Sequence, residues 1–196
     1  MFGLGAFHGI NPGMGWLFAV ALGLQERSRR AVLAALPPIA LGHALSISVV
    51  VAVLLLARAS VPGMALRVGA AAILFGFGCY RLVRSRHPGW VGMRVGFGDL
   101  TLWSFLMASA HGAGLMLVPV LLGLPPEGHA GHFHALPQGW LAAVAVHSAG
   151  HFLVATLVAL LVYEKLGVAI LRRAWFNLDL LWGGALVLSG VIVLVV

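Results

Sequence analysis

The sequence predicts an all-α polytopic membrane protein with six transmembrane helices. These are expected to form two inverted three-helix repeats with both termini outside (N-out/C-out). Three observations lead to this class. Hydrophobic residues make up 61% of the 196 residues and charged residues 9%, with a mean hydropathy of +1.04, as is typical of membrane proteins. Apolar stretches long enough to cross a bilayer recur six times. Basic residues concentrate in alternate loops between those stretches.

Each predicted span approaches or exceeds the roughly 20 apolar residues that a membrane helix needs. The first has no basic residues ahead of it, which argues against a cleaved signal peptide. Together the spans use most of the chain, so one transmembrane domain over 1–196 is expected, with repeat 1 at about 1–84 and repeat 2 at about 97–196. In chain order the predicted spans are about 2–24, 31–57, 63–80, 97–123, 138–163 and 175–196.

The distribution of charge predicts the topology. Of the twelve Lys and Arg residues, ten lie in the first, third and fifth loops, and only Arg58 and Arg67 flank the second. The positive-inside rule places those odd loops in the cytoplasm. We therefore expect a multi-pass protein of a bacterial-type inner (plasma) membrane, with the lipid bilayer as its partner and no nucleic acid; a homo-oligomer stays open. The single cysteine, Cys79, excludes a disulfide framework.

Three spans per half make the two halves insert in opposite orientations, which is typical of secondary transporters. A histidine–glycine step and a glycine–histidine step occur once in each half, inside apolar segments. An imidazole in hydrocarbon is costly unless it has a partner, so these side chains are expected to share one polar site. His147 lies one turn before the last of them, on the same helix face. The four histidines of the repeated steps are His8, His43, His111 and His151.

Proline and glycine interrupt the first span of each half. Pro12 lacks the N–H that would bond the carbonyl of His8, and Pro119 does the same to Leu115. Interrupted helices at corresponding positions of two halves point to a transporter's binding site. The residues predicted to break the helices or to gate the site are Gly9, Pro12, Gly13, Gly112, Gly114 and Pro119.

The ligand types indicate a transition metal. Imidazoles with an amide and no thiolate suit Ni, Co, Zn or Cu ions, whereas calcium and magnesium prefer clusters of carboxylates. The predicted ligands are His8, His43, His111 and His151, joined by His147 and Asn11.

Polar residues outside this set suggest accessory roles. A short histidine-rich loop is predicted to capture metal on the outer side, through His129, His132 and His134. Asp99 and Asp179 each lie a few residues into a span and could couple proton movement to transport. Alternatively, they pair with nearby loop arginines at the membrane surface.

The run from Leu4 to Ile47 resembles the first two spans of the NicO nickel/cobalt exporter family, within the LysE-type transporter superfamily. The resemblance rests on "LGA" at 4–6, on "HGINPG" at 8–13, on a short basic loop and on "HA" at 43–44. It implies a transporter of nickel or cobalt with these histidines at its site.

The sequence therefore predicts a proton-coupled transporter that exports a transition-metal ion through a midplane histidine site, rather than an enzyme. Two alternatives stay open. One is an intramembrane metalloenzyme or haem protein that uses the same histidines as ligands. The other is a LysE-type exporter of a small organic or anionic solute, in which the histidines donate hydrogen bonds and carry protons.

Overall fold

The computed structural model describes residues 1–83, 96–123, 138–166 and 178–195, and all the regular secondary structure in this part is helical. The first predicted span is divided into two helices, and the fourth likewise. In chain order the elements are α1 (Phe2–Ile10), the 3-10 turn η1 (Pro12–Met14), α2 (Trp16–Glu26), α3 (Arg29–Ser60), α4 (Gly63–Val83), α5 (Phe97–His111), the 3-10 turn η2 (Leu115–Leu117), α6 (Val118–Gly123), α7 (Gln138–Leu161), the π-helical turn η3 (Val162–Leu166) and α9 (Leu178–Val195).

Among the described residues, three helices are long and apolar enough to cross a membrane: α3, α4 and the segment Gly139–Lys165, which covers nearly all of α7 and most of η3. A fourth candidate is the pair α5 and Leu115–Gly123, bent by 52° at the intervening break. The described parts of the first and last predicted spans, Trp16–Glu26 and Leu181–Val195, are shorter apolar helices. The described part of the chain is thus helical, with three or four membrane-length spans.

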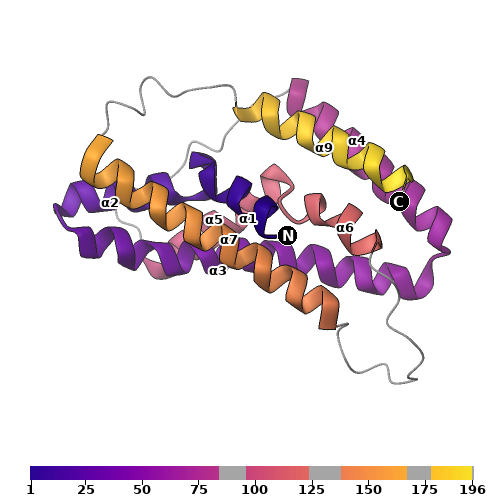
Figure 1. Cartoon of the computed structure of the whole chain (residues 1–196), viewed down its shortest axis with the longest axis horizontal. Coiled ribbons are helices and arrows are strands. Elements are labelled where there is room, and N and C mark those ends of the chain that lie inside the picture. Colours follow the sequence, from indigo (N-terminus) through magenta and orange to yellow (C-terminus); the bar gives the residue numbers. More distant parts are fainter. Residues whose placement is uncertain (84–95, 124–137, 167–177, 196) are drawn as a thin grey trace.

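The helices pair across the two halves of the chain. α1 packs along α7, α3 packs along α5, and α4 packs along α9. Figure 1 shows α4 and α9 side by side along one flank, with the other helices forming the main body. The first span of each half therefore packs on the second span of the other half.

Glycines let the paired helices approach closely. A Cβ on Gly5 would collide with the backbone carbonyl of His147, and one on Gly42 would collide with that of Thr101. A Cβ on Gly150 would come within 2.6 Å of the carbonyl oxygen of Phe2. Small residues at such contacts are how membrane helices maximise van der Waals packing. The glycine before His43 and the glycine before His151 therefore each face the broken helix of the opposite half.

The first helix breaks at the predicted proline. α1 ends at Ile10, Asn11 is extended, and Gly15 adopts a left-handed conformation with φ of 118° before α2 begins. The prediction that the His8 carbonyl lacks a partner is wrong, because this carbonyl accepts a hydrogen bond from the Asn11 N–H at 3.2 Å. Asn11 also accepts from the Gly13 N–H at 2.8 Å. The loop therefore supplies a donor to the His8 carbonyl, which Pro12 cannot do because it lacks an N–H.

The second helix breaks at Gly112, one of the predicted helix-break residues, and not at Pro119. α5 ends at His111, and Gly112 takes a left-handed conformation with φ of 70°. Pro119 instead lies in the first turn of α6, where a missing N–H costs nothing. The carbonyl of Leu115 accepts from the Val118 N–H, so it is not freed by Pro119. Glycine, not proline, interrupts this span.

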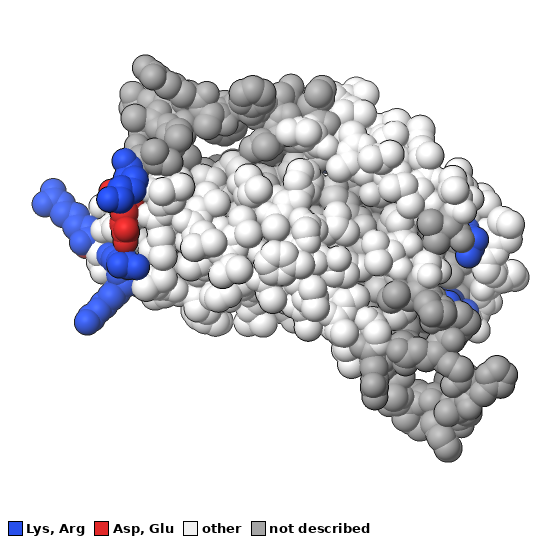
Figure 2. Space-filling model, viewed as in Figure 1, with Lys and Arg blue, Asp and Glu red and all other residues white. Residues whose placement is uncertain are grey.

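Charged side chains gather at the two ends of the long axis. Figure 2 shows lysine, arginine and acidic residues at one end, a few basic side chains at the other, and a largely uncharged face between them. At the first end, Arg29 Nε at the start of α3 pairs with Glu164 Oε1 after α7, at 3.3 Å. Arg58 and Arg67 lie near the turn that joins α3 to α4. The ends thus carry charge that the apolar middle lacks.

Candidate functional site

Five histidines from both halves of the chain lie inside the structure. His8, His43 and His147 are 0% exposed, His151 is 1% exposed and His111 is 2% exposed. They project from α1, α3, α5 and α7, which form two of the three cross-half pairs. Buried polar groups are usually hydrogen-bonded, so this concentration of imidazoles in an apolar interior marks a site.

Four of these rings form one cluster, which we call the four-histidine cluster: His8, His43, His147 and His151. His43 stacks on His151 with ring centroids 3.8 Å apart and planes inclined by 8°. His8 lies edge-on to His43 and to His147, with centroids 5.5 Å and 4.9 Å away. The predicted residues of α1, α3 and α7 are thus brought together, including His147, which the glycine–histidine pattern did not contain.

His43 and His147 face each other through their Nε2 atoms, which lie 3.4 Å apart. Their rings are nearly parallel, at 7°, with centroids 5.6 Å apart. The distance between the ring centroids exceeds the distance between the two Nε2 atoms by about two ring radii. The rings therefore meet head to head rather than face to face. With both rings neutral, one Nε2 carries a hydrogen and the other a lone pair. This contact can therefore hold a proton between the two helices.

His8 and His111 share a second feature, a bond from the ring to the preceding turn. His8 Nδ1 donates to the Leu4 carbonyl at 2.6 Å, and His111 Nδ1 donates to the Met107 carbonyl at 2.8 Å. A ring nitrogen bonded to a carbonyl must carry the hydrogen, so a neutral ring keeps its lone pair on Nε2. Metal-binding histidines typically donate their other N–H in this way. Both rings thus share the tautomer in which Nδ1 carries the hydrogen.

Trp182 of α9 joins the histidines of the two halves, and the sequence analysis missed it. The side chain is 1% exposed, and its ring centroid lies 4.6 Å from that of His8 and 6.0 Å from that of His111. Phe7 packs against the same indole at 4.8 Å. Trp182 lies within the last apolar segment, three residues after Asp179. No periodic pattern in the sequence places it beside histidines that are so distant along the chain.

Of the predicted helix-break residues, Gly9 and Gly13 lie beside the buried histidines. Gly13 faces Asn11 Oδ1 and the imidazole edge of His111, where an added Cβ would sit 3.2 Å and 3.4 Å away. Gly9 packs on the backbone of α7 beside His151. Gly112 packs against Phe77, and Gly114 against Val50. The two breaks therefore meet, because the loop after α1 touches the end of α5.

Asn11 serves the backbone of the first break. Its oxygen accepts the Gly13 N–H, and its Nδ2 is buried without a partner among the described residues. An amide nitrogen only donates hydrogen bonds, so the atom that faces the interior is not a metal ligand as it stands.

Asp99 does not lie in the interior. It is exposed and accepts the Gly96 N–H at 2.9 Å, as a cap at the start of α5. A carboxylate there is favoured by the helix dipole, and Asp99 lies in the first turn of α5, a few residues into the fourth predicted span as expected. Asp179 belongs to the first turn of α9, and its side chain lies outside the described part. The loop with His129, His132 and His134 lies outside the described residues.

The cluster leaves several nitrogens unsatisfied. His8 Nε2, His43 Nδ1 and His147 Nδ1 are buried with no hydrogen-bond partner among the described residues. In the same part of the chain, no three His, Cys, Asp or Glu side chains already have the arrangement of a metal site. The stacking of His43 on His151 explains this, because stacked rings direct their nitrogens side by side. Chemically, the cluster can bind protons and, once its rings turn, a cation that prefers nitrogen.

Fold and site together define a helical protein with membrane-length spans and a buried histidine cluster between its halves. No protein-family model, no curated protein and no solved structure matches the chain.

Proposed function

We propose that this chain is a membrane transporter that exports a transition-metal cation in exchange for protons. The observation that carries the proposal is the four-histidine cluster, in which buried imidazoles from both halves of the chain meet inside an apolar interior. The metal ion is the cargo. In this proposal His111 joins the cluster residues as a ligand from the second half.

The helix pairing supports two inverted three-helix repeats. If the spans of one half correspond in order to those of the other, the pair α1 and α7 corresponds to the pair α5 and α3, and α4 corresponds to α9. His8 and His111 also match in the bond from Nδ1 to the preceding turn. Transporters built from such repeats hold their substrate where the repeats meet. The histidines occupy that meeting point.

The charged ends support six spans with both termini outside. The ion pair between Arg29 and Glu164 puts the predicted first and fifth loops at the same end. Arg27 and Lys165 are exposed near it. A cytoplasmic side rich in basic residues follows from the positive-inside rule. The proposal therefore includes a bacterial-type inner membrane, with the basic end in the cytoplasm.

Ligand chemistry favours a transition metal over calcium or magnesium. Two nitrogens bound tetrahedrally at 2.0–2.1 Å from one ion lie about 3.3–3.4 Å apart. His43 Nε2 and His147 Nε2 are 3.4 Å apart, although their lone pairs face each other. Binding would require these rings to tilt toward a common point and His151 to leave its stack on His43. Nickel, cobalt, zinc and copper ions all accept imidazole ligands.

Protons would compete with the metal for the same atoms. An imidazole binds a metal only when it is neutral, so metal binding releases protons and protonation releases metal. The two Nε2 atoms of His43 and His147 would bind a proton in one state and the metal cation in the other. The breaks at 11–15 and at Gly112 would let the flanking helices turn. This gives exchange of metal against protons without a carboxylate in the cluster.

The resemblance to nickel/cobalt exporters agrees with this proposal. The residues that carry the resemblance form α1, the first break and α3, and they include two rings of the cluster. A haem is disfavoured as the resident group, because His43 and His151 are in direct ring contact and leave no room for a porphyrin between them.

Proteoliposomes provide the direct test of transport. Vesicles that contain the purified protein are expected to move Ni²⁺, Co²⁺, Zn²⁺ or Cu²⁺ across the membrane faster than empty vesicles, with a pH change inside. Calcium and magnesium are expected to cross the membrane of these vesicles no faster than that of empty vesicles. Metal-sensitive and pH-sensitive dyes enclosed in the vesicles measure both fluxes. Equal rates with and without protein for all four metals would contradict the proposal.

Metal binding should be visible through Trp182. Because its ring lies against His8 and near His111, Ni²⁺, Co²⁺ or Cu²⁺ bound at the cluster is expected to quench its fluorescence. Titration of the wild type and of Trp182→Phe isolates this signal from the other five tryptophans. The quenched fraction should fall clearly in Trp182→Phe. Trp103, which packs on Phe18 away from the cluster, supplies the matched control in Trp103→Phe.

A further inference from the structure

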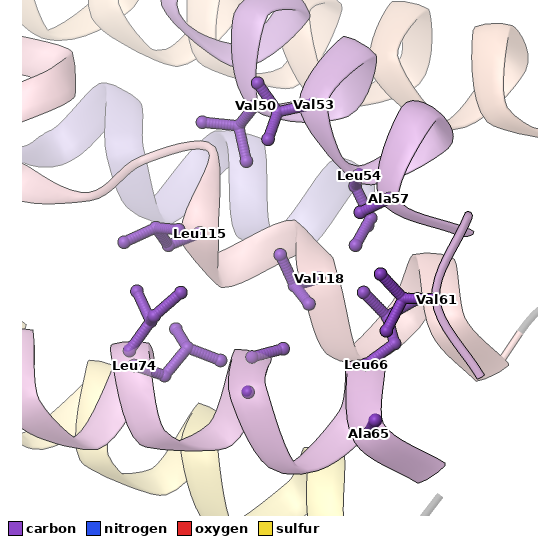
Figure 3. Close-up of a pocket in the computed structure, with 13 residues that line it drawn as sticks. Val50, Val53, Leu54, Ala57, Val61, Ala65, Leu66, Leu74, Leu115 and Val118 are labelled. Carbon is purple, nitrogen blue, oxygen red and sulfur yellow. The ribbon is translucent and has the colours of Figure 1, made fainter. Parts of the chain in front are cut away.

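A second site lies apart from the histidines, in an apolar crevice between α3 and α4. It has a volume of about 270 Å³, and its walls come from α3, α4, η2 and α6. Figure 3 shows the lining side chains, all of them carbon, with Leu115 and Val118 between the two helices. From Val50 to Ala57 on α3 the crevice follows the helix for roughly 10 Å, about a third of a bilayer's hydrocarbon thickness.

Two arginines stand at one end of this crevice. Arg58 follows the lining residue Ala57 on α3, and Arg67 follows the lining residue Leu66 on α4. Both side chains are half-buried, and no carboxylate of the described residues pairs with either. The Arg58 guanidinium lies over the Trp140 ring, 5.6 Å from its centroid. A tryptophan beside basic residues at a helix end is typical of the membrane interface.

We propose that the crevice binds one anionic phospholipid of the surrounding bilayer. An acyl chain would lie between α3 and α4, parallel to these membrane-length helices, and the phosphate would meet Arg58 and Arg67. Charge complementarity selects the occupant. An apolar cleft that ends beside two arginines, neither of them paired with a described carboxylate, matches a molecule with an apolar tail and an anionic head. A peptide segment would bring backbone polar groups into walls that offer them no partner.

Retention of lipid by the purified protein tests this site. Native mass spectrometry of protein equilibrated with phosphatidylglycerol or with phosphatidylcholine should show one retained phosphatidylglycerol and much less phosphatidylcholine. Filling the crevice with Gly69→Leu, where an added Cβ meets nothing within 4 Å, should abolish retention. The double variant Arg58→Gln and Arg67→Gln should weaken the binding of phosphatidylglycerol about 25-fold, because each basic residue near a membrane surface contributes about five-fold to the binding of anionic lipid.

Gly76→Leu is the matched control for Gly69→Leu. Gly76 lies two turns along the same face of α4, also in open space, and does not line the crevice. This variant should retain phosphatidylglycerol like the wild type. Equal retention of the two lipids, or full retention by Gly69→Leu, would overturn the proposal. A dimer that dissociates in Gly69→Leu would also overturn it, by assigning the crevice to a second copy of the chain. The double arginine variant decides the matter if Gly69→Leu does not fold.

Discussion

Replacing His43 by alanine is expected to reduce transition-metal transport at least ten-fold. His43 contacts every other member of the four-histidine cluster: its ring stacks on that of His151, lies edge-on to that of His8, and faces that of His147 through Nε2. Loss of a group that merely orients a metal ligand typically costs 10–100-fold in affinity or activity, so loss of a central ligand should cost at least as much. Initial rates of metal flux into proteoliposomes measure the effect.

Two further variants separate loss of the site from loss of the fold. Ser48→Ala changes an exposed residue of the same helix that bonds only to the Ala44 carbonyl at 2.8 Å, and it should transport like the wild type. His43→Gln keeps a polar side chain of similar length while removing the imidazole. It should be as inactive as His43→Ala, with little change in Tm. Normal metal flux through a folded His43→Gln protein would show that transport does not depend on the four-histidine cluster.

Gly5→Leu is expected to prevent stable folding. Gly5 of α1 lies against the backbone of α7 at His147, where even a Cβ collides with the carbonyl. A backbone cannot yield as a flexible side chain does, so the helices would have to separate along their contact. We expect a loss of about 3 kcal/mol or more, at or beyond the upper end of overpacking effects. The yield of monodisperse protein on size-exclusion chromatography and the Tm in detergent report this loss.

Gly3→Leu is the control on the same helix. Gly3 lies two residues before Gly5, and a Cβ there meets nothing within 4 Å. Its Tm and yield should match those of the wild type. If Gly5→Leu gave the same Tm as Gly3→Leu, the close packing of α1 on α7 would be wrong, and the placement of His8 beside His147 with it.

The sequence predicts best those features that arise from composition and local chemistry. Long apolar runs predicted the helices, because only a regular helix satisfies its backbone in hydrocarbon. The cost of burying an imidazole pointed to His8, His43, His111 and His151, and the structure buries all four. The break near Pro12 was also predictable, since proline lacks the N–H that a helix interior needs.

Other features depend on contacts between distant segments or on backbone conformations that residue type alone does not reveal. Pro119 does not mark the second break, because proline is well tolerated in the first turn of a helix. Gly112, which was among the predicted helix-break residues, marks it instead; only its left-handed conformation was not predictable. Trp182 reaches His8 only because α9 packs beside the core formed by both halves. Asp99 lies a few residues into its span as predicted, whereas its hydrogen bond with the Gly96 N–H was not predicted.

The crossed pairing of helices has a consequence for how the protein is assembled. Since α1 lies on α7 and α3 lies on α5, neither half encloses its own histidines. A nascent chain that has inserted only its first half would expose Gly5, Gly42 and His43 to lipid. These surfaces are covered only when the second half packs against the first, so stable assembly requires both halves of the chain.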